Sequence, residues 1–400
     1  MKEKGTVKEI GLTKKNKEMS GILDYLDWRG DLSFSRDGFN KVDNLIFSVF
    51  SYLPFEGIVP EETDEGSITL SEAAERFKEK RNRIESLQHH PLFRQIPKLL
   101  FKAASSTRYQ DIQLSHYVNQ MDYEQFKQFS AIVFSLSNEE HYIAFRGTDD
   151  SLIGWKEDFQ MSFMDEVQSQ KQAVIYINSI FSQLNGKFYL GGHSKGGNLA
   201  VYAATRATEE MRERILGIYN NDGPGFQAHV IQSEGYQSIL RKINTLIPKS
   251  SVIGMLLEHC EEYKVVDSSQ TGIMQHDAFT WQVKGAHFIY EEDLTQGSLN
   301  FNNAIRAWVD QLSLKQRAQF VDALFEILQA TGAKTFGELS KEKLTMANTM
   351  IKTYKNMDTV TQAQLKNSIE IFFKESQKAL RNSVRFTMGK DISRIFVTKK

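Results

Sequence analysis

Residues 187–200 read KFYLGGHSKGGNLA, and this stretch decides the fold. The apolar run 188–190 is typical of a short strand, and the small and apolar residues that follow Gly197 recur at helical spacing. Between them, Gly192, Ser194 and Gly196 have the G-x-S-x-G spacing of a nucleophile elbow, a tight strand–turn–helix that exposes the serine hydroxyl. The pattern predicts an α/β fold with Ser194 as a nucleophile. A glycine turn with a purely structural role is the alternative.

Strand-like runs continue on both sides of this elbow and alternate with helical patterns. They lie at residues 131–136, 142–146, 215–219, 243–247, 265–266 and 280–283. The first two are separated by Ser-Asn-Glu-Glu at 137–140, which predicts a hairpin. Strands that alternate with helices predict a mostly parallel central sheet with helices on both faces.

The chain divides into three predicted parts. Residues 1–20 are expected to form a flexible tail, and residues 21–300 an α/β core with a helical insertion near 69–130. After about residue 300 only helical patterns remain, so residues 301–400 are expected to form a C-terminal helical subdomain.

Composition and charge limit the classes of partner and the cellular compartment that the sequence predicts. The chain has 400 residues and a net charge of −1, which gives no general attraction to nucleic acid. Its single cysteine, Cys260, excludes an internal disulfide, and the charged N-terminus lacks a signal-peptide pattern, so we expect a cytoplasmic protein. No cofactor and no metal site is expected. The last segment, from Lys378 onward, is basic; a solvated face and contact with a membrane surface both remain open.

A serine nucleophile needs a histidine base. The histidines that follow the elbow are His229, His259, His276 and His287. His276 is the preferred base because it lies late in the core, in a loop that precedes strand-like residues. His287 is the second candidate, and His259 is explained by a position at a helix end.

The carboxylate that orients the base is harder to assign. Asp222 follows the strand at 215–219, and polar groups at the carboxyl ends of such strands face the ligand site. Its other explanation is a turn aspartate in Asp-Gly-Pro. Asp267, after a later strand, is the alternative acid. Asp277 adjoins His276, and adjacent residues rarely orient each other's side chains.

An oxyanion hole should complete the site. We expect one donor to be the backbone N–H of Lys195 and the other to come from Thr148, in the loop after the strand at 142–146. The Lys195 side chain is unusual, because a cation in the first turn of a helix opposes the helix dipole. It should therefore have a partner: Asp149, Asp150 or an anionic group of the substrate.

Several motifs together resemble class 3 lipases and, more closely, a bacterial family of uncharacterised lipase-like α/β-hydrolases. The similar segments are YLDWRGD at 25–31, FRGTDD at 145–150 with Trp155 and Asp158 after it, GGHSKGGNLA at 191–200, NDGPGF at 221–226 and QHD at 275–277. The resemblance covers roughly residues 25–283. It implies the α/β-hydrolase fold, Ser194 as the nucleophile, His276 as the base and Thr148 in the oxyanion hole. Lipases carry the triad aspartate directly after the strand at 243–247, whereas here residues 248–253 contain no carboxylate.

Two functions therefore stay open. The first is a serine hydrolase that cleaves an acyl ester, of a lipid or a small molecule, through an acyl-enzyme on Ser194. The apolar segment 252–257 would then be an acyl site, a lid or simply a buried helix. The second is a non-catalytic interaction protein on a hydrolase scaffold, which the missing carboxylate favours.

Overall fold

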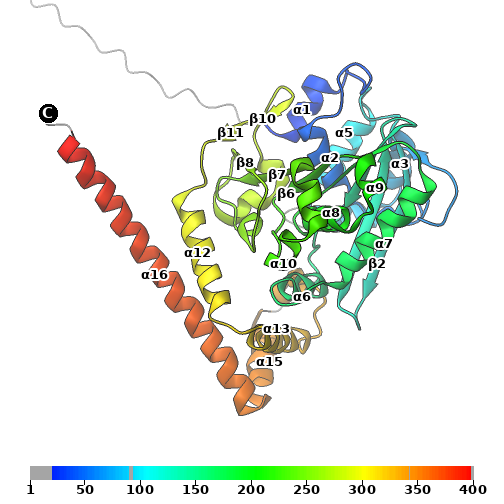
Figure 1. Ribbon diagram of the computed structural model, residues 1–400. Coiled ribbons are helices and arrows are strands. Elements are labelled where there is room, and N and C mark those ends of the chain that lie inside the picture. The colour runs from blue at the N-terminus through cyan, green and yellow to red at the C-terminus, as the bar shows by residue number, and fades with distance from the viewer. Residues whose placement is uncertain (1–19, 90–92, 342, 398–400) are drawn as a thin grey trace, which may run out of the picture.

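The computed structural model describes residues 20–89, 93–341 and 343–397 (Figure 1). Within these residues, a nine-stranded sheet runs in the order β1-β2-β3-β4-β5-β6-β7-β8-β11, and β9 and β10 form a separate ribbon. The strands are β1 (Ile68–Thr69), β2 (Gln113–Asp122), β3 (Lys127–Ser135), β4 (Glu140–Phe145), β5 (Lys187–His193), β6 (Ile215–Asn221), β7 (Ile243–Pro248), β8 (Tyr263–Val266), β9 (Val283–Lys284), β10 (His287–Phe288) and β11 (Tyr290–Glu291). The predicted tail, apart from Ser20, lies outside the described residues.

The sheet is mixed, so the prediction of a mostly parallel sheet is only partly right. Strands β4 to β8 are parallel neighbours, whereas β1, β2, β3 and β11 pair antiparallel. The β3–β4 hairpin is confirmed, with Ser135 opposite His141. Strand β2 was not predicted and falls inside the expected helical insertion, next to the helices at residues 70–104. The antiparallel strands therefore extend a parallel centre, and that centre carries the elbow.

Side chains of the central strands alternate between two apolar layers. Ile132 and Ala144 belong to the layer under α2 (Lys41–Phe50). Val133 and Ile143 face the layer that contains residues of α7 (Gln168–Gln183) and α8 (Lys195–Arg206). This period of two is the ordinary geometry of a strand buried on both faces. It explains why α2 packs on β5 from one side while α8 packs on the same strand from the other.

The helices follow the chain around this sheet (Figure 1). Besides α2, those before the elbow are α1 (Ile22–Arg29), α3 (Leu70–Lys78), α4 (Arg81–His89), α5 (Ile96–Ala104), α6 (Leu152–Gln160) and α7 (Gln168–Gln183). Those between the elbow and β7 are α8 (Lys195–Arg206), α9 (Glu209–Arg214), α10 (Ala228–Ile231), α11 (Glu234–Ile239) and the 3₁₀ turn η1 (Leu240–Lys242). Further 3₁₀ turns are η2 (Ile253–Met255), η3 (Gly272–His276) and η4 (Ala278–Thr280).

The C-terminal part is helical, as the sequence indicates. It contains α12 (Gln296–Asp310), α13 (Leu314–Gln329), α14 (Phe336–Lys341), α15 (Lys343–Asn356) and the long α16 (Thr359–Val397). Val321 and Phe325 of α13 pack with Leu152 at the start of α6, and α12 lies against α16 (Figure 1). Lys378 pairs with Glu375, and the side chains of the predicted basic segment beyond it lie outside the description. In the described part of the chain, none of the helices has both the length and the apolar character that crossing a bilayer requires.

Candidate active site

The elbow between β5 and α8 holds Ser194 in a backbone conformation that side chains rarely adopt, with φ 58° and ψ −134°. The glycines permit it: a Cβ on Gly192 would lie 2.3 Å from the backbone carbon of Gly196, and one on Gly196 would lie 2.1 Å from the carbonyl oxygen of Phe145. The Ser194 N–H donates to the Asn221 carbonyl at 2.9 Å. Strain of this kind persists only where the surrounding structure fixes it, and it is common at functional sites.

His276 and Asp222 meet across the loops that follow the strands. His276 Nδ1 lies 2.7 Å from Asp222 Oδ2, and the Asp222 side chain is buried. A carboxylate only accepts, so Nδ1 is the donor in this bond, and in the neutral imidazole Nε2 is then the acceptor. The other carboxylate oxygen accepts from Ser251 Oγ at 2.5 Å and from the Gly254 N–H at 3.1 Å. Asp222 is therefore held by three donors, one of which is the predicted base.

The donors Ser251 and Gly254 belong to the stretch after β7, which corresponds to the position of the triad aspartate in lipases. Here that stretch has no acid, and it binds the aspartate that follows β6 instead. The apolar segment 252–257 contains η2, whose Gly254 leaves space for Asp222: a Cβ there would lie 2.3 Å from Oδ1. Neither of these two supporting residues was among the predicted site residues.

His193 joins the strand that precedes Ser194 to the loop that carries His276. Its Nε2 donates to the His276 carbonyl at 2.7 Å, which makes Nδ1 the acceptor of the Tyr52 hydroxyl at 3.2 Å. The two imidazole rings lie 4.5 Å apart between centroids. Burial, together with the neighbouring His276, holds the pKa of His193 well below its usual value, so His193 is neutral. Among the described hydrogen bonds none joins the Ser194 hydroxyl to His276, an alignment that in ligand-free enzymes often forms only with the substrate.

The alternative residues have other partners. Asp267 Oδ1 lies 2.5 Å from Lys249 Nζ, and His259 Nδ1 lies 2.9 Å from Glu261 Oε1. His287 is exposed on the β9–β10 ribbon. Asp277 accepts the Phe279 N–H at 3.0 Å, and burial raises its pKa to about 6. Of the predicted pairs, the structure joins His276 with Asp222.

Thr148 lies in the loop after β4, as expected for an oxyanion loop. Gly147 beside it packs on the elbow, since a Cβ there would lie 2.4 Å from the His193 carbonyl oxygen and 3.1 Å from Ser194 Cβ. The Thr148 hydroxyl donates to Asp158 Oδ2 at 2.6 Å. Burial raises the pKa of Asp158 to about 6, against the opposing effects of Lys195 and Thr148.

The partner of Lys195 was predicted incorrectly. Its buried ammonium lies 3.0 Å from Glu157 Oε2 and 4.0 Å from Asp158 Oδ1, both on α6. Asp149 lies 3.7 Å from Arg146, and Asp150 accepts the Gly337 N–H. Glu157 lies within the Trp155–Asp158 motif, but nothing in its spacing shows that it faces the elbow.

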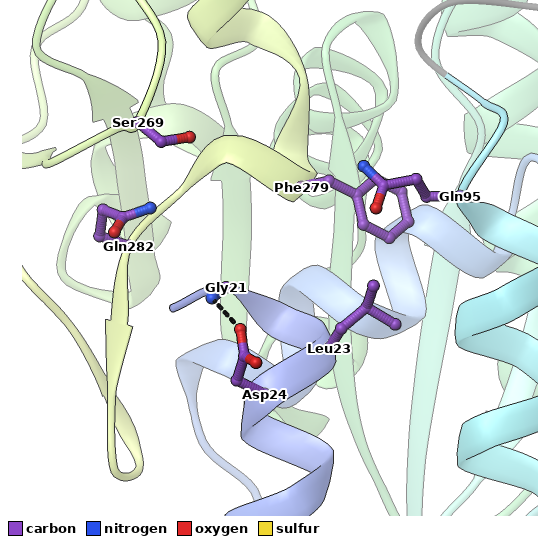
Figure 2. Close-up of a pocket in the computed structure, with 7 residues that line it drawn as sticks. All are labelled: Gly21, Leu23, Asp24, Gln95, Ser269, Phe279 and Gln282. Carbon is purple, nitrogen blue, oxygen red and sulfur yellow. Dashed lines mark hydrogen bonds between the residues drawn. The ribbon is translucent and has the colours of Figure 1, made fainter. Parts of the chain in front are cut away.

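Two cavities of the described residues have linings that include none of Ser194, His276 and Asp222. Figure 2 shows one of about 170 Å³, in which the Gly21 N–H donates to Asp24. It is lined by Gly21, Leu23, Asp24, Gln95, Ser269, Phe279 and Gln282, none of which belongs to the predicted catalytic set. No group of histidine, cysteine or acidic side chains in the described chain could hold a metal ion.

Comparisons with known proteins identify a family. The Mbeg1-like family matches residues 103–326, which is more than half of the chain, and the chain belongs to this family. Among solved structures, a fungal lipase–inhibitor complex is similar at 13% identity and a TM-score of 0.32, over 51% of this chain and 83% of that one. The M37 lipase is similar at 14% identity and the same TM-score, over 54% of this chain and 69% of that one. No curated protein matches the sequence.

Proposed function

We propose that this member of the Mbeg1-like family is a serine hydrolase that cleaves acyl esters through an acyl-enzyme on Ser194. The observation that carries the proposal is the 2.7 Å hydrogen bond between His276 and the buried Asp222. That bond leaves His276 Nε2 as an acceptor, on the loop that His193 ties to the elbow. Base and acid thus have the relation that a Ser-His-Asp triad requires.

The chemistry assigned to each residue follows from that relation. His276 Nε2 takes the proton as Ser194 Oγ attacks the ester carbonyl carbon, and Asp222 stabilises the resulting imidazolium. The Lys195 N–H and Thr148 bind the oxyanion of the tetrahedral intermediate. The alcohol leaves with the proton from His276, and water then releases the acid from Ser194 by the same steps in reverse order.

A lipid or another acyl ester in the cytoplasm is the substrate we infer. The motifs that resemble those of lipases support an acyl ester as the substrate. In this proposal the C-terminal helices form a subdomain separate from the catalytic core. The Asp222–His276 contact supports the hydrolase over the alternative, a non-catalytic interaction protein, because it supplies a carboxylate in place of the one missing after β7.

Hydrolysis of p-nitrophenyl esters from acetate to palmitate tests this function. The wild-type chain should release p-nitrophenol with saturation kinetics, and the chain length with the highest kcat/KM would define the acyl preference. Ser194→Ala should abolish turnover. Ser162→Ala, which removes a hydroxyl that donates to the Phe159 carbonyl just after α6, should retain it. Turnover equal in wild type and Ser194→Ala would show that Ser194 is not the nucleophile. A folded wild-type chain without turnover would support the interaction protein.

A further inference from the structure

We propose that the Lys195 side chain is a positioning residue of the oxyanion hole: through Gln128 it orients the Gly147–Thr148 peptide, while its own backbone N–H is the other donor. This inference rests on the proposed hydrolase function. It assigns a role to the elbow residue whose charge opposes the dipole of α8.

The Lys195 ammonium is buried and its three N–H groups all have acceptors. Nζ lies 2.8 Å from Gln128 Oε1, 3.0 Å from the Gln128 carbonyl oxygen and 3.0 Å from Glu157 Oε2. An ammonium has three donors and no acceptor, so this geometry uses its full capacity. Lys195 is thereby fixed to the first residues of β3 and to α6.

Gln128 transmits this position to the oxyanion loop. Because Oε1 accepts from Lys195, Nε2 is the donor that faces the Gly147 carbonyl, at 3.4 Å. In a trans peptide the C=O and the following N–H point in opposite directions. Holding the Gly147 carbonyl toward Gln128 therefore turns the Thr148 N–H away from the network, in a loop that packs on Ser194.

Neighbouring groups hold the network in place. Glu157 Oε1 accepts the Ser169 N–H at 2.7 Å and Oε2 accepts the Gln128 N–H at 3.2 Å. Gly154 of α6 packs closely against the side chains of both Thr148 and Gln128. A Cβ on Gly154 would lie 2.9 Å from Thr148 Cγ2 and 3.0 Å from Gln128 Oε1. The loop and the glutamine amide have little space for another arrangement.

Stability alone is a weak explanation for this lysine. A buried ion pair often contributes no more than well-packed apolar side chains would, and a cation at a helix N-terminus opposes the dipole. Orientation of a donor is a gain that an apolar side chain at position 195 would not supply. Preorganised donors of this kind are often the largest single contribution to acyl-transfer catalysis.

The test compares kcat, KM and thermal melting on p-nitrophenyl butyrate. Removing an oxyanion donor costs about 10²–10³ in kcat, so misorienting one through Lys195→Met should lower kcat at least about tenfold with KM nearly unchanged. Lys156→Met is the matched control: it removes another buried lysine of the same region, paired with Asp322 at 3.0 Å, and should leave kcat unchanged.

A charge-balanced variant separates orientation from stability. Lys195→Met leaves Glu157 as an unpaired buried charge and is expected to melt earlier, whereas Lys195→Met with Glu157→Gln removes that charge and should recover the melting temperature. Positioning predicts that kcat stays low in this double variant even though it is folded. Recovery of kcat together with the melting temperature overturns the proposal.

Gln128→Leu tests the path itself. It should lower kcat as Lys195→Met does, and the two substitutions together should cost little more than either alone, because both interrupt one chain of contacts. Fully additive losses overturn the route through Gln128. A wild-type chain without esterase activity would overturn the proposed function as well, whereas an active wild type with unaffected Lys195 variants overturns only this inference.

Discussion

Two aspartates follow strand ends in the parallel centre of the sheet, and they have different partners. Asp222 comes directly after β6 and Asp267 directly after β8, and both are buried. Asp222 accepts from His276, Ser251 and the Gly254 N–H, whereas Asp267 pairs with the ammonium of Lys249.

Strand β7 lies between β6 and β8 in the sheet, and the loop that follows β7 accounts for the different partners of the two aspartates. Its Lys249 neutralises Asp267 on one side, and its Ser251 donates to Asp222 on the other. The end of a parallel strand thus brings a carboxylate to the edge where ligands bind, but the neighbouring loop determines whether that carboxylate is available to a histidine.

The sharpest way to break this comparison is to replace each acid by its amide. Asp222→Asn should lower kcat on one ester by about 10⁴, as in serine proteases, because the imidazole loses the anion that holds its tautomer. Asp267→Asn should have little effect on kcat. Thermal melting of both variants checks folding. A loss of kcat at Asp267 with near-normal activity at Asp222 would reverse the assignment.

The histidines provide the second test. His276→Ala should lower kcat at least about a hundredfold, the low end for removal of a general base. His287→Ala, on the exposed β9–β10 ribbon, should cost far less. Both are measured on the same ester at saturating concentration. Equal losses of kcat in the two variants would mean that His276, the partner of Asp222, is not the general base.

Ser251 sharpens the role of the loop after β7. Ser251→Ala removes one donor from Asp222 but leaves the Gly254 N–H and His276, so kcat should fall by about tenfold, the effect of one hydrogen bond to a charged group. Ser250→Ala is the neighbouring control, because its hydroxyl contacts Thr295 rather than Asp222. A loss at Ser250 as large as that at Ser251 would indicate a general disturbance of the loop.

The smallest expected effect is a change in the pH dependence of stability at Asp277. This residue adjoins His276 in the chain but lacks the Ser251 and Gly254 donors that hold Asp222. Burial raises its pKa to about 6, above the value near 3.9 of an unfolded chain. Its contribution to stability is therefore complete below about pH 4 and is lost as the pH rises through about 6. The melting temperature of Asp277→Asn, relative to wild type, should increase from pH 4 to pH 7. A constant or decreasing difference would contradict the raised pKa.

Features that depend on a contiguous stretch of sequence could be predicted, whereas contacts between distant segments could not. The strand, glycines and helix around Ser194 are contiguous, so the elbow is readable, and the aspartate and histidine that meet in the structure were the preferred candidates. Strand β2 was missed because its polar residues and a bulge between Ser115 and Val118 interrupt the alternation. Glu157 and Gln128 were missed because they reach Lys195 from a helix and a strand far away in the chain.

Labelling with a fluorophosphonate, followed by mass spectrometry, tests the central claim most directly. If Ser194, His276 and Asp222 form one catalytic unit, the wild-type chain should carry one phosphonyl group on Ser194. Ser194→Ala should carry none, Asp222→Asn should react far more slowly, and Asp267→Asn should react like wild type. A folded wild-type chain that stays unlabelled, or one labelled at another residue, would contradict the account.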